Sequence, residues 1–353
     1  MLELFRKEMA RLDPACEVLS LLERSEVEPV FGFAEGLRRG TGLRGMLDRT
    51  EAAAVRLEPD LAVLVSFSGL HLPLGRRLRR RGVPVLYLGP PQVWAWGGWR
   101  TRQLRKAADK VACLFRFEEE LLRRAGVDAE YFGYPLLDGV VSNLSREQVM
   151  ERLGFRPDER YVVFLPGSRP AEAGYHVPLF SEVYRRLQQI AGGVRGVFVS
   201  AAEGTKSEVR SQNTECRMGD TEYRYDVMRY AECGCAVSGT VTAELAILAV
   251  PMVVSYHLRW LSRVMARTLV RTPVFALPNI LAGTRLVPEK LEPSAEWLAG
   301  MLEPLLSDSP ERRQQVEGLA RVKAELGPPG AMARICMLAR EMAGGGPGSG
   351  GGS

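Results

Sequence analysis

The sequence predicts an α/β protein with two domains, each built on a parallel, doubly wound sheet. Short apolar runs alternate with amphipathic runs along most of the chain, which is typical of strands joined by helical crossovers. The 353 residues, 46% hydrophobic and 25% charged, are enough for two hydrophobic cores. We therefore expect an N-terminal domain over 1–140, a C-terminal domain with closing helices over 141–343, and a flexible Gly/Ser tail over 344–353.

The N-terminal domain is expected to hold four strands alternating with helices. It opens with a predicted helix over 3–12 and an extended segment over 15–22. A Rossmann-like domain ordinarily opens with a strand and a glycine-rich turn, so this domain is expected to lack its first strand and loop. Strands are expected over 60–66, 83–88, 110–115 and 129–132. Helices are expected over 45–57, 72–81, 101–108 and 118–125.

The C-terminal domain follows a polar segment over 139–158 that contains one helix. A charged stretch over 203–220 has no clear periodicity. Strands are expected over 161–165, 196–201, 235–237 and 251–256. Helices are expected over 177–190, 222–231, 260–270, 296–306, 311–325 and 332–342.

Three loops in the C-terminal domain carry groups suited to an anionic ligand. They cover 166–172, 238–244 and 277–283, and the second runs into a helix whose N-terminus favours anions. Because parallel strands end at the same sheet edge, the loops together predict a nucleotide site. The candidate residues are Gly167, Ser168, Arg169, Glu172, Ser238, Gly239, Thr240, Thr242, Glu244 and Asn279.

Each of these groups also has an ordinary structural interpretation. Ser238 to Thr240 is also a common helix N-cap sequence. Arg169 is equally suited to a surface ion pair, Glu244 to a helix-dipole interaction, and Asn279 to a turn. The loops favour a ligand site only when taken together.

The composition excludes several classes of function. The net charge of +5 is modest and no nucleic-acid motif is present, so nucleic acid is not an expected partner. Six scattered cysteines without a CxxC pair, with three histidines, argue against a zinc site and for reduced thiols. No signal peptide or membrane-spanning window is found, and no GxGxxG follows a first strand.

Six sequence blocks make the assignment more specific. In chain order they are PPQVWAW, CLFRFEEELLRRAGV, YFGYPLLD, FLPGSRPAE, VSGTVTAELAILAVPMVVSY and LPNILAGTRLVPE. Together they resemble the lipid-A-disaccharide synthase family of GT-B glycosyltransferases, from about residue 22 to residue 343. The resemblance implies two Rossmann-like domains facing a cleft, with a UDP-sugar donor in the C-terminal domain.

The resemblance also implies a reaction and roles for the loop residues. UDP-2,3-diacylglucosamine and 2,3-diacylglucosamine 1-phosphate would be joined through a β-1,6 linkage, with inversion and release of UDP. Arg169 would lie near the nucleotide phosphates and Ser238 to Thr240 would cap the diphosphate. Glu244 would lie near the ribose and Asn279 near the donor. No cofactor and no metal are expected, because a helix dipole and arginine can balance the charge of the departing UDP.

The N-terminal half departs from the family pattern. No GExSGD-type loop is present, and SFSGLH stands in place of a DxPDFN-like segment, with Ser66 and Gly69 where carboxylates are expected. Tyr134 replaces the histidine of the usual GHP. Two interpretations follow: a synthase whose start has been lost and whose base has moved, or a catalytically impaired paralogue that binds a nucleotide sugar or acts as a scaffold. We favour the transferase because the donor-side motifs are intact.

His71 is the candidate general base for the acceptor hydroxyl. It is the only obvious substitute in the SFSGLH loop, and a neutral imidazole accepts a proton near pH 7. A single histidine after a strand is often structural instead.

Acylated substrates lie in a membrane. The protein is therefore expected to be cytoplasmic and to bind peripherally to the inner face of the cytoplasmic membrane. Trp94 and Trp96 are the candidate acceptor-side or membrane-side residues, beside basic clusters over 76–81 and 100–106. The alternative is a solvated basic face with both tryptophans in the core. The predicted helix over 260–270 is a second candidate membrane surface or a homodimer face.

Overall fold

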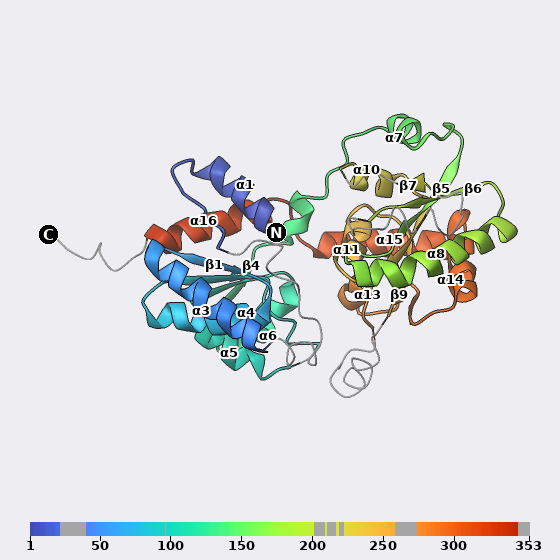
Figure 1. Cartoon of the computed structure of the whole chain (residues 1–353). Helices are drawn as coiled ribbons and strands as arrows, with labels where there is room; N and C mark the ends of the chain where they lie inside the picture. The colour runs from blue at the N-terminus through green and yellow to red at the C-terminus, as the bar shows by residue number, and fades with distance from the viewer. Residues whose placement is uncertain are drawn as a thin grey trace. The chain divides into compact units, whose positions relative to one another are not determined.

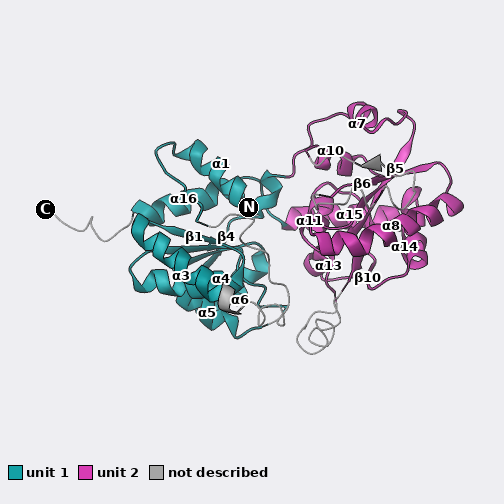
Figure 2. Ribbon diagram, in the orientation of Figure 1, with its two compact units in different colours: residues 1–139, 260–271, 326–353 teal, residues 140–259, 272–325 magenta. Residues whose placement is uncertain are grey.

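The computed structural model divides the chain into two compact units (Figure 2). Unit 1 contains Met1–Gly139, Trp260–Arg271 and Leu326–Ser353, and unit 2 contains Val140–Arg259 and Thr272–Glu325. The structure describes residues 1–21, 40–95, 97–200, 209, 217–218, 222–257 and 274–344.

Unit 1 is built on a four-stranded parallel sheet, as the sequence predicts, and the strand order is β1-β2-β3-β4. Residues 15–21, the described part of the expected extended segment, form no strand. The elements are α1 (Leu2–Leu12), α3 (Gly40–Leu57), β1 (Ala62–Val65), α4 (Ser68–Arg80), β2 (Val85–Leu88), α5 (Arg100–Ala107), β3 (Lys110–Cys113), α6 (Arg116–Arg124), β4 (Ala129–Tyr131), the 3₁₀ helix η1 (Pro135–Asp138) and α16 (Ala331–Gly344).

The sheet of unit 1 is covered on both faces, because alternate residues of each strand point to opposite sides. In β2, Val85 and Tyr87 pack with α3, α4, α5 and α6, whereas Leu86 and Leu88 pack with α1 and α16. Figure 1 shows α1 beside α16. Since these leucines pack against α1 and α16, the two terminal helices are part of the core of unit 1. Burying a side chain of this size stabilises the folded state by about 1.5–3 kcal/mol.

The last helix corrects the expected extent of the C-terminal domain. The sequence suggests that the domain runs over 141–343, but α16 belongs to unit 1. Three hydrogen bonds hold it there. The Asp138 carboxylate accepts from the Gly330 and Met332 N–H groups at 2.5 and 2.9 Å, and the Arg334 guanidinium donates to the Phe132 carbonyl at 2.7 Å. These contacts join segments almost 200 residues apart, which no local pattern reveals.

Unit 2 has a parallel sheet with the order β10-β9-β8-β5-β6-β7. The predicted helix over 260–270 lies outside the described residues, as does most of the charged stretch over 203–220. The elements are α7 (Arg146–Leu153), β5 (Arg160–Leu165), α8 (Pro170–Ile190), β6 (Val194–Phe198), β7 (Arg217–Met218), α10 (Arg224–Arg229), β8 (Cys233–Val237), α11 (Thr240–Ile247), β9 (Met252–Tyr256), α13 (Leu277–Ala282), β10 (Glu289–Leu291), α14 (Ala295–Leu302), the 3₁₀ helix η2 (Glu303–Leu306) and α15 (Pro310–Glu325).

Helices also cover both faces of the second sheet. Val162 and Phe164 of β5 pack with α8 and α14, whereas Tyr161 and Val163 pack with α7, α11 and α15. Both units are therefore α/β structures on parallel sheets with helices on both faces, which confirms the predicted fold class. Within the described residues, no helix is long and apolar enough to cross a membrane.

Candidate functional site

Two of the three expected loops, those after β5 and β8, lie side by side at one edge of the unit 2 sheet. β5 and β8 pair in parallel, with Leu165 opposite Ala236, so the loops that follow them begin at the same level. Each loop leads directly into a helix, α8 at Pro170 and α11 at Thr240. Folds of this kind bind ligands at the carboxyl edge of the parallel sheet. The two loops are therefore close together at that edge, as the sequence predicts.

The glycine of the first loop is required by its backbone and by a close neighbour. Gly167 has φ +106°, and a Cβ atom there would lie 2.6 Å from Glu172 Oε2. Its carbonyl accepts a hydrogen bond from Ser200 Oγ at 2.6 Å. Gly167 therefore lets the loop fold against the first turn of α8.

Arg169 forms an ion pair with Glu172. A surface ion pair was the structural alternative to a phosphate contact in the sequence analysis. The Arg169 Nη1 atom lies 2.5 Å from Glu172 Oε1, and the two side chains are 43% and 35% exposed. Because both groups stay partly in solvent, the pair is worth little to stability. The ion pair orients Arg169 without burying its side chain.

The second loop leaves the N-terminus of α11 without a side-chain cap. Gly239 is the N-cap residue, and no side chain accepts from the first N–H groups. The Ser238 hydroxyl donates instead to the Phe275 carbonyl at 3.2 Å, and Thr240 is exposed. The stretch therefore does form a helix N-cap, as its structural interpretation expects, but the capping residue is Gly239 and the cap has no side-chain hydrogen bond among the described residues.

Thr242 and Glu244 support this helix end from within. Thr242 is fully buried and its Oγ1 donates to the Gly239 carbonyl at 2.8 Å. Glu244 is 5% exposed and accepts from Arg224 Nη2 at 2.6 Å and from the Tyr225 hydroxyl at 3.3 Å. Burial raises the pKa of Glu244, and the Arg224 charge opposes that rise. Glu244 is thus a buried ion-pair partner.

Asn279 differs from its expected arrangement. Residues 277–282 form the short helix α13, and Gly283 ends it in a left-handed conformation. Asn279 is fully buried: its Nδ2 donates to the Val287 carbonyl at 2.9 Å and its Oδ1 accepts from the Val287 N–H at 2.8 Å. The side chain is buried and both ends of its amide bond to Val287, so Asn279 holds the chain that follows α13.

In unit 1, the candidate base His71 lies in the first turn of α4. The preceding turn is strained, because Ser66 and Phe67 both adopt left-handed φ values of 54° and 30°. The Ser66 carbonyl accepts from the Tyr87 hydroxyl at 2.5 Å and lies 3.2 Å from His71 Nδ1. A carbonyl can only accept, so Nδ1 carries the proton in this contact, and a second backbone hydrogen bond joins the ring to Val65.

The ring of His71 is packed among aromatic side chains. Phe67 and Tyr87 contact it edge to face, with ring centroids 5.8 and 6.4 Å away. Burial lowers the pKa of His71, so the neutral form dominates near pH 7. Sequence reasoning missed Tyr87, which lies on the next strand, because pairing between β1 and β2 aligns it with Leu64.

Arg100 was also not singled out as a site residue. Its Nη1 donates to Ser68 Oγ at 3.3 Å, which brings a cation from the start of α5 to the same edge of the sheet. Burial lowers the pKa of Arg100. The sequence signals were its place in the basic cluster over 100–106 and its position four residues after the WAW motif.

Trp94 has a structural role. Its indole Nε1 donates to Glu118 Oε1 at 3.0 Å, and Glu118 Oε2 accepts from the Leu114 and Phe115 N–H groups at 3.0 and 3.2 Å. Glu118 is 2% exposed, and burial raises its pKa to about 7. Trp96 lies outside the described residues.

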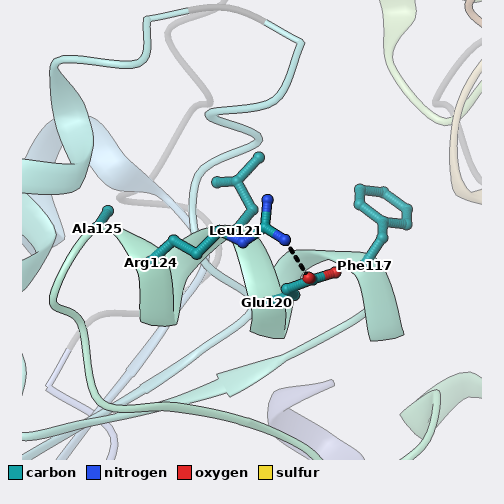
Figure 3. A pocket seen from close by; sticks show the side chains of 5 residues that line it. All are labelled: Phe117, Glu120, Leu121, Arg124 and Ala125. Carbon is teal, nitrogen blue, oxygen red and sulfur yellow. Dashed lines mark hydrogen bonds and ion pairs between the residues drawn. The ribbon is translucent and has the colours of Figure 1, made fainter.

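Tyr134, which replaces a histidine of the family pattern, is buried and stacks on Phe115 with ring centroids 5.5 Å apart. A nearby hollow of about 420 Å³ lies on α6, and Figure 3 shows the ion pair between Arg124 and Glu120 in its lining, with nitrogen and oxygen 2.5 Å apart. No site residue expected from the sequence lines it.

Metal ligands are not gathered in the described parts of either unit: no group of three or more His, Cys, Asp or Glu side chains is placed to hold a metal ion there. Among the described residues, Cys16, Cys113, Cys233, Cys235 and Cys336 form no disulfide.

Solved structures define the class to which the fold belongs. UDP-GlcNAc 2-epimerase from Neisseria meningitidis, solved bound to UDP-GlcNAc, is similar with a TM-score of 0.62 at 10% identity, over 96% of this chain and 89% of that chain. The S. aureus MnaA–UDP co-structure has a TM-score of 0.59 at 13% identity, over 83% and 77%. The fold is that of GT-B glycosyltransferases and related epimerases.

Sequence comparison identifies the family within this class. Residues 10–328 match the family described as Lipid-A-disaccharide synthetase. Lipid-A-disaccharide synthase from Syntrophus aciditrophicus is 32% identical over 88% of this chain and 82% of its own length, and that from Geobacter metallireducens is 31% identical over 96% and 92%. The chain belongs to the lipid-A-disaccharide synthetase family, whose members are glycosyltransferases of lipid A biosynthesis.

Proposed function

We propose that the chain is a lipid-A-disaccharide synthase. It transfers 2,3-diacylglucosamine from UDP-2,3-diacylglucosamine to 2,3-diacylglucosamine 1-phosphate and releases UDP, with inversion and without a metal. Family membership supports the reaction. The observation that carries the donor assignment is the pair of adjacent loops after β5 and β8, one of which ends at a helix N-terminus without a side-chain cap.

The donor diphosphate is proposed to bind between the first turn of α11 and Arg169. Backbone N–H groups from Thr240 onward supply donors, and the positive end of the helix dipole favours the charge that develops on departing UDP. Arg169 supplies a planar fork suited to phosphate oxygens, with Glu172 holding it in place until the ligand competes for it. Gly167, Ser168 and Thr242 shape this loop edge.

Glu244 and Asn279 are proposed to act indirectly on the donor. The pair of Glu244 with Arg224 packs behind α11, and Arg224 is 40% exposed. Asn279 fixes the backbone at Val287. In this proposal both residues position the loops that bind the nucleotide and do not contact the nucleotide themselves. That positioning role explains why both occur in the sequence blocks that resemble the family.

His71 is the proposed general base for the acceptor hydroxyl. Inversion in a single displacement requires one base, and with Nδ1 donating to the Ser66 carbonyl the proton would be taken by Nε2. The lowered pKa keeps the ring neutral near pH 7. Removing a proton from the hydroxyl charges the ring, and the Ser66 carbonyl accepts from that imidazolium.

Contact with the inner face of the cytoplasmic membrane is proposed through unit 1. Trp99 is 61% exposed, and the Arg100 guanidinium lies 5.4 Å from its ring centroid. An exposed tryptophan beside arginine suits a lipid interface. Trp94 is tied to Glu118 and is not needed for this contact. A homodimer through residues 260–270 stays a prediction, because these residues lie outside the described part of the chain.

The donor assignment is tested by UDP titration in a calorimeter. Arg169→Ala is expected to weaken UDP binding about 10- to 100-fold, since it removes a charge-assisted hydrogen bond worth about 1.5–3 kcal/mol. Arg185→Ala is the matched control, because Arg185 forms a similar ion pair with Glu182 farther along the same helix. Equal affinity in the wild type and Arg169→Ala would remove Arg169 from the donor site.

A further inference from the structure

A basic pocket lies at the amino edge of the unit 1 sheet. The pocket has a volume of about 620 Å³ and is bounded by the last turns of α4 and α5 and by the residues that enter β2 and β3. Its charged lining residues are Arg76, Arg79, Arg80, Arg105, Lys106 and Asp109. Because the strands are parallel, this edge is opposite the one that carries Ser66 and His71.

Only one of the five cations is neutralised by the pocket's carboxylate. Asp109 Oδ1 lies 2.9 Å from Arg79 Nε and 2.7 Å from Arg79 Nη2, and its Oδ2 accepts from the Val85 N–H at 2.8 Å. The other four have no ion-pair partner among the residues that the structure describes: Arg76, Arg80, Arg105 and Lys106.

The neighbouring arginines of the same helix behave differently. Arg77 lies 2.6 Å from Asp48 and 2.7 Å from Glu51, and Arg81 lies 2.9 Å from Glu51. The side of α4 that meets α3 is thus charge-balanced, whereas the side that lines the pocket is not. Cations also stabilise a helix C-terminus by about 0.3–1 kcal/mol each. That effect explains one or two cations at each helix end, but it gives no reason for four around one hollow, where they repel each other.

Close packing between α4 and α5 fixes the shape of the pocket. Gly75 of α4 lies against α5: a Cβ atom there would be 2.3 Å from the Ala107 carbonyl oxygen and 2.9 Å from a Leu64 methyl. Arg79 Nη1 also donates to the Arg105 carbonyl at 3.0 Å, which ties the last turns of α4 and α5 together. The cations of both helices are therefore brought side by side before any ligand arrives.

We propose that this pocket binds a phosphate group, as a second anion site separate from the donor loops of unit 2. Guanidinium groups match phosphate oxygens in geometry, and a bound anion removes the mutual repulsion of the four cations. The phosphate belongs either to an anionic lipid headgroup or to a soluble phosphate compound. The site does not depend on the transferase reaction, because its residues lie at the other edge of the sheet from His71.

The full chain is tested with two probes. Vesicles of phosphatidylcholine alone and with one part in five of phosphatidylglycerol report headgroup binding by flotation, and pyrophosphate reports soluble phosphate binding by a shift in melting temperature. The pocket variant is Arg80→Glu with Lys106→Glu. The control variant, Lys7→Glu with Arg44→Glu, makes the same change in net charge on α1 and α3.

A headgroup site predicts that the wild type and the control variant float with anionic vesicles, while the pocket variant binds at least tenfold more weakly. A soluble phosphate site predicts the same ranking in the pyrophosphate shift. If neither probe binds the wild type, or if the pocket variant loses no more than the control variant, the proposal is overturned. Should the glutamate variant fail to fold by circular dichroism, Arg80→Gln with Lys106→Gln takes its place.

Discussion

At the scale of single residues, the bond between His71 and the Ser66 carbonyl has a kinetic consequence. His71→Gln is expected to lower kcat about 10²- to 10⁴-fold, because it removes the proposed base. The UDP dissociation constant is expected to stay unchanged, because the donor loops are in unit 2. Initial rates at saturating donor and acceptor measure the first quantity and calorimetry the second. Wild-type turnover in His71→Gln would exclude His71 as the base.

The pH dependence of kcat follows from the same residue. Burial lowers the pKa of His71 below its usual 6.5, so the active neutral form persists to lower pH. The rate is therefore expected to fall only as the pH drops through that lowered pKa, and this acidic limb is expected to vanish in His71→Gln. A rate profile from pH 4.5 to 8 measures it. An unchanged acidic limb in the variant would assign it to another group.

Asn279 makes a prediction about stability. Asn279→Ala leaves the buried N–H and carbonyl of Val287 without partners, which is expected to cost about 2–4 kcal/mol in the free energy of unfolding. Urea denaturation followed by circular dichroism measures that cost. Under native conditions, UDP affinity is expected to remain within about threefold of wild type. A large loss of UDP affinity in a variant of unchanged stability would indicate direct contact with the nucleotide.

At the scale of elements, Glu118 links the segment before α5 to the start of α6. Its folded pKa of about 7 lies above the ordinary 4.5, so the stability associated with this group is present below pH 4.5 and is lost as the pH rises through 7. The free energy of unfolding of the wild type, relative to that of Glu118→Gln, is expected to fall by on the order of 3 kcal/mol between pH 4.5 and 7.5. Urea denaturation at both pH values, followed by Trp fluorescence, measures it. A constant difference between the two proteins would contradict the raised pKa.

The elements themselves were largely predictable from the sequence. Strands such as β2 and β5 are short apolar runs between polar or glycine-containing segments, and those signals are local. Two elements, β10 and α13, were not predicted because both resemble loops in sequence. Strand β10 has only three residues, none of them fully buried. Helix α13 contains Pro278 in its first turn and ends at Gly283.

The site was predictable in position but not in detail. Sequence order places glycine-containing loops after β5 and β8, and parallel pairing brings them together. The partners of Glu244 and Asn279 depend on side chains from α10 and on the backbone at Val287, which pattern alone does not reveal. The strained turn at Ser66 was equally invisible, because its left-handed residues are not glycines.

At the scale of the whole molecule, the two units are linked through the chain path: α16 returns to unit 1 after unit 2 is complete. Deleting residues 331–353 is expected to expose Leu86 and Leu88, which pack with α1 and α16. Hydrogen exchange is therefore expected to speed up in β2 and β3 and to stay unchanged in β5 and β8. Deleting only 345–353 is the matched control. Unchanged protection in β2 would contradict the assignment of α16 to the core of unit 1.

The central claim is that the chain joins two acylated glucosamines, and product analysis tests it most directly. The purified protein is mixed in detergent with UDP-2,3-diacylglucosamine and 2,3-diacylglucosamine 1-phosphate, and the mixture is analysed by mass spectrometry. We predict a disaccharide 1-phosphate carrying all four acyl chains, with one UDP released per disaccharide, and neither product when the acceptor is omitted. A folded protein that binds UDP yet forms no disaccharide would contradict the account.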